Sequence, residues 1–365
     1  MAVFNVLIIG PGYAGKRYIN AFQSLEGEFR TTEFNYAYVA ISKKDLPFTY
    51  YSDIDEALKQ YLPDVIVVAV SDGKHAEVLF QLEGYSGFIL CEKPLVNSAD
   101  DLHRIQHALS CTSGFCMDMV ERYSEATDYL KNYIRDNSLT LLRANFIWGK
   151  DRIHDHRTTC GVPSEIIHSL DLVEWVGDSN EHLELDAAIG TESNFSISGD
   201  NILDSVSVTA RLGEALITGY SSGYSSFTNI IRQRTLDFIF SSPEKELVYA
   251  RLTFDTPEWD NDHLRLWKHT KQGDELIQAF STSFDGAEQA LKTIQKLRKQ
   301  VREVIHYILN KLPPEHDFTD LNTSLRLQRL LNTIEHKARR LGPANYVLKY
   351  ERELFTEDGS LEQLG

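Results

Sequence analysis

A lysine that directly follows an apolar segment is the first candidate for chemistry. The segment FILCEKPLV, residues 88–96, runs from apolar residues into Glu92, Lys93 and Pro94. Pro94 restricts Lys93 to extended conformations and so aims its side chain, although base rates favour a trans peptide bond between them. A lysine among cations or in an apolar pocket takes part in proton transfer, and a charged one holds a substrate oxygen. A surface ion pair with Glu92 explains this segment equally well.

A glycine-rich segment near the N-terminus has the spacing of a dinucleotide-binding loop. LIIGPGYAGKRY places Gly10, Gly12 and Gly15 in a G-x-G-x-x-G pattern between an apolar strand and a helical segment, which is the context that this motif requires. Gly10 allows the tight turn, Gly12 lets the backbone approach a pyrophosphate, and Gly15 allows close packing of helix and strand. The N–H groups of the helix N-terminus then face the phosphates. An ordinary glycine turn is the alternative.

The end of the second predicted strand indicates which dinucleotide to expect. A carboxylate at this end would bind the ribose hydroxyls of NAD, but Glu33 lies before the strand, at the wrong end. The residues that follow the strand are Ser42, Lys43 and Lys44. A hydroxyl group and two cations suit the 2′-phosphate of NADP. We therefore predict NADP, with NAD as the alternative if Asp45 turns inward.

A third group of polar residues lies on a helical segment in the middle of the chain. In GVPSEIIHSLDLVEWV, residues Ser164, His168 and Asp171 share one helix face and Glu165 lies close to it. An imidazole titrates near neutral pH, so His168 is suited to carry a proton during a reaction. A structural histidine with its hydrogen bonds satisfied inside the protein is the alternative.

The segment before this helix, DRIHDHRTTC at residues 151–160, is polar and cationic. Arg157 is suited to bind a phosphate or carboxylate group of a substrate, for example a nucleotide-linked sugar. A solvated loop explains the segment nearly as well. Glu165 and His168 form an E-x-x-H pair, but no second pair is present to complete a metal site. We therefore predict no metal.

The elements that must position these residues change in character near residue 120. Up to that point, short apolar strands alternate with helical segments, as in a parallel sheet wound from βαβ units. A helical segment then leads into longer strands of alternating polarity, such as residues 139–149, which indicate an antiparallel sheet with one solvent-facing side. The last quarter is helical. We predict a dinucleotide-binding domain at residues 1–120 and a substrate-binding and oligomerisation domain at residues 121–365.

Composition and charge disfavour several classes of protein. The chain of 365 residues has 37 Lys and Arg against 53 Asp and Glu, a net charge of −16, which disfavours nucleic-acid binding because the phosphates would be repelled. No segment approaches the roughly 20 apolar residues of a membrane-spanning helix, and the N-terminus lacks the features of a signal peptide. The four cysteines form no CxxC pair. We expect a cytoplasmic protein without a nucleic-acid or membrane partner.

Several segments together resemble the Gfo/Idh/MocA family, named for glucose–fructose oxidoreductase and inositol dehydrogenase. In chain order they are GPGYAGKR, VSDGKHAEV and CEKPL, and ERYSEATDYLKNYI is similar to the family's segment that links its two domains. The resemblance implies an α/β protein with an N-terminal Rossmann domain. It also implies a C-terminal α+β domain with an open, largely antiparallel sheet. The implied activity is NAD(P)-dependent oxidation or reduction at a hydroxyl or ketone, most often of a sugar or cyclitol.

The resemblance also assigns roles to individual residues. It makes Lys93 the residue that contacts the reacting oxygen, and His168 and Asp171 match the family's histidine and its later acid. The family's earlier Asp is absent, because Ser164 stands there with Glu165 beside it. The expected catalytic residues are Lys93 and His168. The expected substrate-binding residues are Arg157, Ser164, Glu165 and Asp171. The expected cofactor-binding residues are Gly10, Gly12, Tyr13, Ala14, Gly15, Ser42, Lys43, Val70, Ser71, His75, Glu92 and Lys93, with Val70, Ser71 and His75 at the nicotinamide end.

We predict an NADP- or NAD-dependent oxidoreductase that acts on a sugar, cyclitol or nucleotide-linked sugar and self-associates into a dimer or tetramer through its second domain. One alternative is a protein of the same fold that uses bound NAD internally to cleave a glycosidic bond. Another is a cofactor-binding sensor or regulatory protein without turnover, which the replacement of the family's Asp by Ser164 favours.

Overall fold

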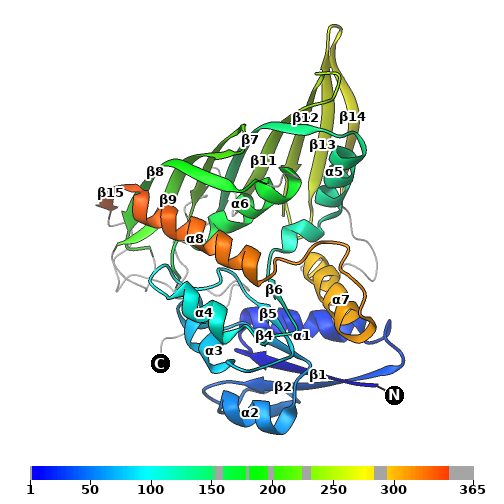
Figure 1. Ribbon diagram of the computed structural model, residues 1–365, viewed down its shortest axis with the longest axis vertical. Coiled ribbons are helices and arrows are strands. Elements are labelled where there is room, and N and C mark those ends of the chain that lie inside the picture. The colour runs from blue at the N-terminus through cyan, green and yellow to red at the C-terminus, as the bar shows by residue number, and fades with distance from the viewer. Residues whose placement is uncertain are drawn as a thin grey trace. The chain divides into compact units, whose positions relative to one another are not determined.

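A computed structural model describes residues 2–150, 152, 159–177, 181–195, 201–223, 232–282 and 294–344. The chain forms two compact units (Figure 1). The first comprises Met1–Tyr123 and Ile294–Gln328, and the second comprises Ser124–Thr293 and Arg329–Gly365. Helix α8 (Leu321–Lys337) contains the boundary between them. No helix within the described ranges is both long enough and apolar enough to cross a membrane.

The first unit is built on a six-stranded sheet in the order β3-β2-β1-β4-β5-β6, and every pair of neighbouring strands is parallel. The strands are β1 (Ala2–Ile9), β2 (Thr32–Val39), β3 (Thr49–Tyr51), β4 (Val65–Val68), β5 (Phe88–Cys91) and β6 (Gly114–Met117). All residues of β4 and β5 are buried, as expected for parallel strands covered on both faces. The predicted Rossmann architecture is confirmed.

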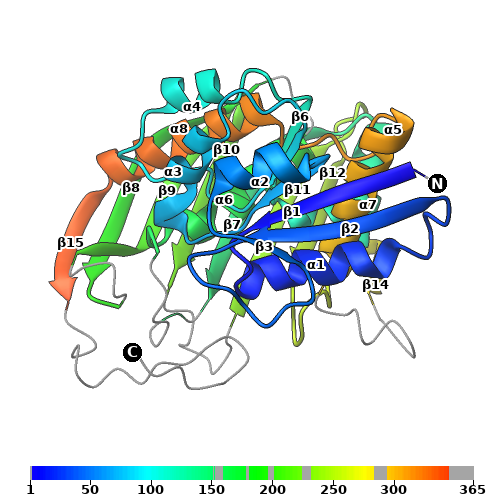
Figure 2. The same cartoon turned by 90° about the horizontal axis from the view of Figure 1, so that it is seen from below.

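Helices cover both faces of this sheet (Figure 2). They are α1 (Tyr13–Leu25), α2 (Ile54–Tyr61), α3 (His75–Gln81), α4 (Leu102–Ala108) and α7 (Gln295–Asn310), with the 3-10 helices η1 (Asp72–Lys74) and η2 (Val120–Tyr123). Right-handed crossovers place α1 on one face and α2, α3 and α4 on the other. Because the strand order reverses between β1 and β4, the loops that follow these two strands border the crevice at which open α/β sheets bind ligands.

Helix α7 differs from the predicted division of the chain, because residues 294–328 belong to the first unit and not to a domain at residues 121–365. The apolar side of α7 is buried at Leu297, Val301 and Val304, and the helix packs against α1. Gln300 also donates a hydrogen bond to the Met117 carbonyl oxygen at 3.3 Å. A helical period in the sequence predicts that one side is buried, but not which sheet or helix buries it.

Aspartate side chains cap two helices of this unit. Asp53 caps α2, because its carboxylate accepts a hydrogen bond from the Glu56 N–H at 2.9 Å. Helix α4 starts at Leu102, and Asp101 caps it. Asp101 accepts hydrogen bonds from two N–H groups of the first turn, as a strong N-cap residue does. The peptide bond before Pro94 is cis, contrary to the base rate.

The second unit holds a nine-stranded sheet in the order β14-β13-β12-β11-β7-β10-β9-β8-β15. Neighbouring strands are antiparallel except for the pairs β7–β10 and β8–β15. The strands are β7 (Thr140–Lys150), β8 (Leu183–Ser193), β9 (Ile202–Leu212), β10 (Ala215–Ser222), β11 (Arg232–Ser241), β12 (Leu247–Thr253), β13 (His263–Thr270), β14 (Gly273–Ser281) and β15 (Arg339–Ala344).

One face of this sheet is covered by α5 (Glu125–Asp136) and α6 (Pro163–Gly177), as Figure 1 shows. Along β7, buried residues such as Phe146 and Trp148 alternate with exposed ones such as Asn145 and Ile147. The exposed face carries paired polar side chains, among them Arg211 with Asp186. The predicted open, largely antiparallel sheet is therefore confirmed.

Candidate functional site

The glycine loop follows β1 and packs on itself and on the end of β4. Gly10 has a φ of 89°, and a Cβ atom there would lie 2.8 Å from the Ala69 carbonyl oxygen. A Cβ atom on Gly15 would lie 2.3 Å from the Gly10 carbonyl oxygen. Gly12 differs, because its φ is −77° and no heavy atom lies within 4 Å of a Cβ built there. The fold thus requires glycine at 10 and 15, whereas Gly12 keeps one side of the loop open.

The first turn of α1 offers its N–H groups without a capping side chain. Gly12 occupies the N-cap position, no side chain caps the helix, and the first turn contains no acidic residue. Tyr13 and Ala14 begin the helix, and the Arg17 guanidinium lies 5.9 Å from the centre of the Tyr13 ring. The N-terminus of a helix with a cation one turn along attracts an anion such as a pyrophosphate.

The end of β2 lies beside the glycine loop, because the Gly10 N–H donates to the Val39 carbonyl oxygen at 3.1 Å. Ser42 and Lys43 follow shortly after β2, and both are exposed. The loop after β2 is held by Tyr38, whose hydroxyl group contacts the backbone N and O of Lys44, each at 3.0 Å. The residues predicted to bind the 2′-phosphate therefore lie at the same end of the sheet as the glycines.

His75 connects the loops that follow β4 and β5. Its side chain is fully buried, with Nδ1 2.7 Å from the Pro94 carbonyl oxygen and Nε2 3.1 Å from the Val70 carbonyl oxygen. Both partners are carbonyl oxygens, so both contacts tie the ring to the backbone of neighbouring loops. His75 thus links the backbone at Val70 to the backbone at Pro94. Ser71, next to Val70, precedes η1 and is exposed.

Lys93 and Glu92 lie at the carboxyl end of β5. The Glu92 N–H donates to the Val68 carbonyl oxygen at 2.9 Å, which extends the ladder between β4 and β5 by one residue. Both side chains are half-buried. The structure therefore brings the glycine loop, the Val70 loop and Lys93 to adjacent strand ends at one edge of the sheet.

In the second unit, the face of α6 that carries the predicted polar residues is buried. Ser164, Glu165, His168 and Asp171 are each at most 5% exposed. The His168 ring stacks on the indole of Trp148 in β7, with centroids 5.5 Å apart and an interplanar angle of 24°. The imidazole is thus held in a fixed orientation by an aromatic neighbour.

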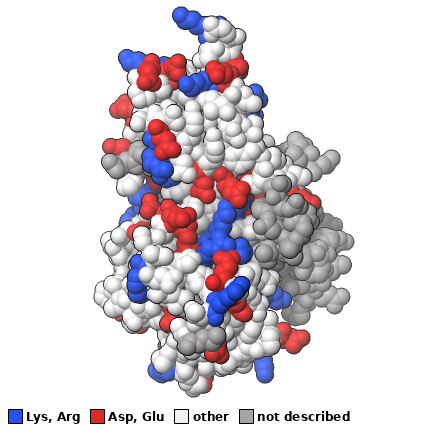
Figure 3. All heavy atoms as spheres, turned by 90° about the vertical axis from the view of Figure 1, so that its right-hand side faces the viewer, with Lys and Arg blue, Asp and Glu red and all other residues white. Residues whose placement is uncertain are grey.

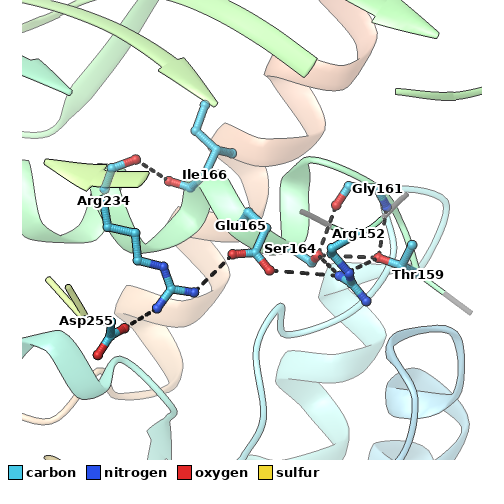
Figure 4. A network of polar contacts seen from close by, with 9 residues as sticks. Arg152, Thr159, Gly161, Ser164, Glu165, Ile166, Arg234 and Asp255 are labelled. Carbon is cyan, nitrogen blue, oxygen red and sulfur yellow. Dashed lines mark hydrogen bonds and ion pairs between the residues drawn. The ribbon is translucent and has the colours of Figure 1, made fainter. Parts of the chain in front are cut away.

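Glu165 lies between two arginine side chains (Figure 4). One Glu165 oxygen is 3.4 Å from Nη2 of Arg234, and the other is 3.9 Å from Nη1 of Arg152. Arg234 also pairs with Asp255. All four side chains are at most 10% exposed. Buried charges of this kind are tolerated because each has an opposite partner.

Ser164, which stands where the family has its earlier Asp, is also engaged inside the protein (Figure 4). Its hydroxyl group donates to the Gly161 carbonyl oxygen at 2.9 Å and accepts from Arg152 Nη1 at 3.2 Å. Arg152 Nη1 also lies 3.3 Å from the Thr159 hydroxyl oxygen. Arg157, the predicted substrate clamp, lies outside the described residues.

Arg234 and Trp148 are site residues that the sequence analysis did not identify. The Arg234 guanidinium lies 5.1 Å from the Trp148 ring and 5.3 Å from the Trp259 ring. In β11, Arg234 occupies the buried face together with Leu236 and Phe238. A charged residue in phase with the apolar positions of a strand is the signal by which the sequence could have revealed Arg234.

Replacing Arg234 by methionine should destabilise the protein by about 3–5 kcal/mol, because Glu165 and Asp255 would lose their shared cationic partner while buried. Arg211→Met is the matched control, since Arg211 forms an exposed pair with Asp186 on the same sheet, and surface pairs of this kind contribute little. Urea unfolding followed by circular dichroism measures both variants. Equal stability of the two variants would contradict a buried ion-pair network.

A group of side chains capable of holding a metal occurs in the first unit. Ligand atoms of Glu303, Glu315 and His316 lie within 4.8 Å of one another. The His316 imidazole hydrogen-bonds the Glu303 carboxylate, so an ion pair accounts for the grouping. None of the three belongs to the predicted site.

Comparison with known proteins finds a family likeness in the first 117 residues. Residues 4–117 match the Gfo/Idh/MocA family model, described as an oxidoreductase family with an NAD-binding Rossmann fold. An inositol 2-dehydrogenase from Salmonella paratyphi B is 22% identical over 144 residues, which cover 38% of this chain and 43% of that enzyme. The match thus spans less than half the length of this relative.

Two solved structures extend the likeness to both units. Levoglucosan dehydrogenase in complex with NADH and L-sorbose has a TM-score of 0.70 and 14% identity, with coverage of 93% of this chain and 97% of its own. A super-repressor mutant of Gal80p from Saccharomyces cerevisiae has a TM-score of 0.70 and 14% identity, with coverage of 92% and 96%. At these identities the likeness shows a shared fold, which therefore occurs in a dehydrogenase and in a repressor.

Proposed function

We propose, from the match of residues 4–117 to the Gfo/Idh/MocA oxidoreductase family model, that the protein is a nicotinamide-dependent dehydrogenase or reductase. It would act at a hydroxyl-bearing or ketone carbon of a carbohydrate-like substrate. The observation that carries the proposal is the placement of the glycine loop, the Val70 loop and Lys93 at adjacent carboxyl ends of one parallel sheet. Ligands of open α/β sheets bind at this edge.

The proposal gives each unit a separate task. In the first unit, Gly12 and the α1 N-terminus bind the pyrophosphate, and Lys93 holds the substrate oxygen as a fixed positive charge or proton donor. In the second unit, His168 accepts or donates the accompanying proton, and Ser164, Glu165 and Asp171 form the substrate-binding face. When bound, the dinucleotide supplies or accepts the hydride.

The proposed substrate class rests on the relatives and the charge distribution. One relative is an inositol 2-dehydrogenase, and one structural neighbour is a levoglucosan dehydrogenase with NADH and L-sorbose. On the face shown in Figure 3, Lys and Arg side chains lie among Asp and Glu instead of forming a broad basic surface. A small neutral or singly charged carbohydrate in the cytoplasm fits these observations better than a nucleic acid does.

We also propose that the protein self-associates through the exposed face of the second unit's sheet. Apolar residues on this face include Ile147, Ile189 and Leu216, which are 36%, 49% and 50% exposed. Exposed apolar side chains on a regular sheet form a natural contact between two copies of a chain. A homodimer or homotetramer is expected.

Introducing negative charges at positions 42 and 43 tests the preference for NADP over NAD. The double variant Ser42→Asp/Lys43→Glu should lower the NADP-to-NAD affinity ratio about 10- to 100-fold, because charge-assisted hydrogen bonds to the 2′-phosphate become repulsive. Fluorescence titration with NADPH and NADH measures the ratio. Lys59→Glu, in the last turn of α2, is the control that keeps the ratio. An unchanged ratio in the double variant would refute the assignment of NADP.

A regulatory protein that binds the dinucleotide without turnover is the second candidate. The observation that favours it is the engagement of Ser164 and Glu165 inside the protein, since these residues stand at and beside the family's Asp. The shared fold of Gal80p shows that this architecture serves repressors as well. If the dinucleotide binds but no sugar ketone oxidises NADPH and no sugar alcohol reduces NADP⁺, the regulatory function would be preferred.

A further inference from the structure

Asp118 lies at the carboxyl edge of the first unit's sheet, beside the loop that carries Lys93. It directly follows β6, just as Glu92 directly follows β5, and the parallel register pairs Cys91 with Met117. The Asp118 N–H donates to the Cys91 carbonyl oxygen at 2.9 Å, which continues the ladder past the strand ends. In-register residues of neighbouring parallel strands point to the same face. Glu92 and Asp118 are therefore neighbours on one face of the sheet.

The side chain of Asp118 is buried inside the first unit. Its side chain is nearly inaccessible, at 6% exposure, and Tyr18 of α1 is fully buried. Neither Oδ1 of Asp118 nor the Tyr18 hydroxyl group has a hydrogen-bond partner among the described residues. Burying an ionised carboxylate with an oxygen that accepts no hydrogen bond costs far more than burying a neutral carboxylic acid. The geometry therefore favours the protonated form of Asp118.

Charged groups around Asp118 shift the pKa of its carboxyl group in both directions. Burial raises the pKa of the Asp118 carboxyl well above its usual range, and the nearby Glu92 charge raises it further. Arg17 of α1 and Lys93 lower this pKa, while Glu121 of η2 raises it. A like charge close to a buried carboxyl group opposes the ionisation of that group. The remaining neighbours are Tyr18 and the thiols of Cys91 and Cys116.

We propose that Asp118 is a positioning residue of the active site. Its buried carboxyl group keeps its proton at neutral pH, so the Lys93 ammonium has one negative charge fewer beside it. With Asp118 neutral, the Lys93 charge remains directed at the substrate oxygen. With Asp118 ionised, an added negative charge attracts the ammonium toward the sheet and repels an anionic dinucleotide. The catalytic meaning rests on the proposed function, whereas the protonation of Asp118 does not.

Infrared spectroscopy of the whole protein tests the protonation directly. We expect the C=O stretch of a protonated carboxyl group near neutral pH, far above the usual aspartate pKa of about 3.9. This band should shift on labelling with [4-¹³C]aspartate and disappear in Asp118→Asn. It should persist in Asp55→Asn, which removes an exposed acid of α2. The isotope shift assigns the band to an aspartate; if Asp118→Asn does not fold, Asp118→Glu retains a carboxyl group at this position whose band lacks the isotope shift. Absence of a labelled band at neutral pH would overturn the proposal.

The pH dependence of kcat/KM supplies the catalytic readout. The Asp118 carboxyl group is neutral below its raised pKa and ionised above it. The kcat/KM of the wild type should therefore fall when the pH rises through this pKa. Asp118→Asn removes this fall and Asp55→Asn retains it, whereas a purely structural role would leave the profile of Asp118→Asn unchanged. A labelled band without any turnover would uphold the protonation and reject the proposed function. Turnover without the band would reject the inference alone.

Discussion

Replacing Lys93 by alanine is expected to lower kcat/KM by about 10³-fold, because it removes the positive charge that holds the reacting oxygen. NADPH should still bind, since the glycine loop and the N-terminus of α1 hold the pyrophosphate independently of this side chain. Steady-state kinetics on a panel of sugar ketones, with NADPH binding measured by fluorescence, checks both expectations.

The matched control for Lys93→Ala is Lys74→Ala, which removes an exposed lysine that pairs with Glu77 in the same unit. This control should retain wild-type kcat/KM. If Lys93→Ala also retained it while binding NADPH, Lys93 would have no part in the chemistry and the regulatory candidate would be preferred.

Replacing Gly12 by valine is expected to raise the Kd for NADPH at least about 100-fold, equivalent to roughly 2.7 kcal/mol of binding free energy. The structure separates this effect from folding. No heavy atom lies within 4 Å of a Cβ built on Gly12, and its φ of −77° is accessible to any residue. The new side chain would therefore obstruct only a ligand that approaches the loop.

Gly27→Val is the control for Gly12→Val, because a Cβ atom there also meets nothing within 4 Å. Both variants should unfold within a few degrees of the wild type, and Gly27→Val should bind NADPH normally. Gly15→Val should instead destabilise the fold, since its Cβ would collide with the Gly10 carbonyl oxygen. Normal NADPH binding by Gly12→Val would show that the glycine loop does not hold the dinucleotide.

The features that the sequence predicted correctly depend on local patterns. The strand before the glycines and the glycine spacing together specify the turn at Gly10 and the start of α1. The rule that ligands bind beyond the carboxyl ends of parallel strands placed Lys93 at the correct edge. Each of these inferences needs only a few neighbouring residues, so the fold and the positions of the glycine loop and Lys93 in it were predictable.

The features that the sequence did not predict depend on partners far apart in the chain. Glu165 is neutralised by Arg234, 69 residues away, and no spacing rule connects the two. His75 is buried because both of its ring nitrogens face carbonyl oxygens of neighbouring loops, which a pattern in one segment cannot reveal. Asp118 was visible only as an acid at the end of a strand, and its burial depends on the packing of α1.

The most direct test of the proposed function is a crystal structure of the protein with bound NADPH. We predict that the pyrophosphate lies against Gly12 and the first turn of α1, and that nicotinamide C4 faces the Lys93 side chain. Electron density for the dinucleotide elsewhere, or a nicotinamide ring remote from Lys93, would contradict the proposed function.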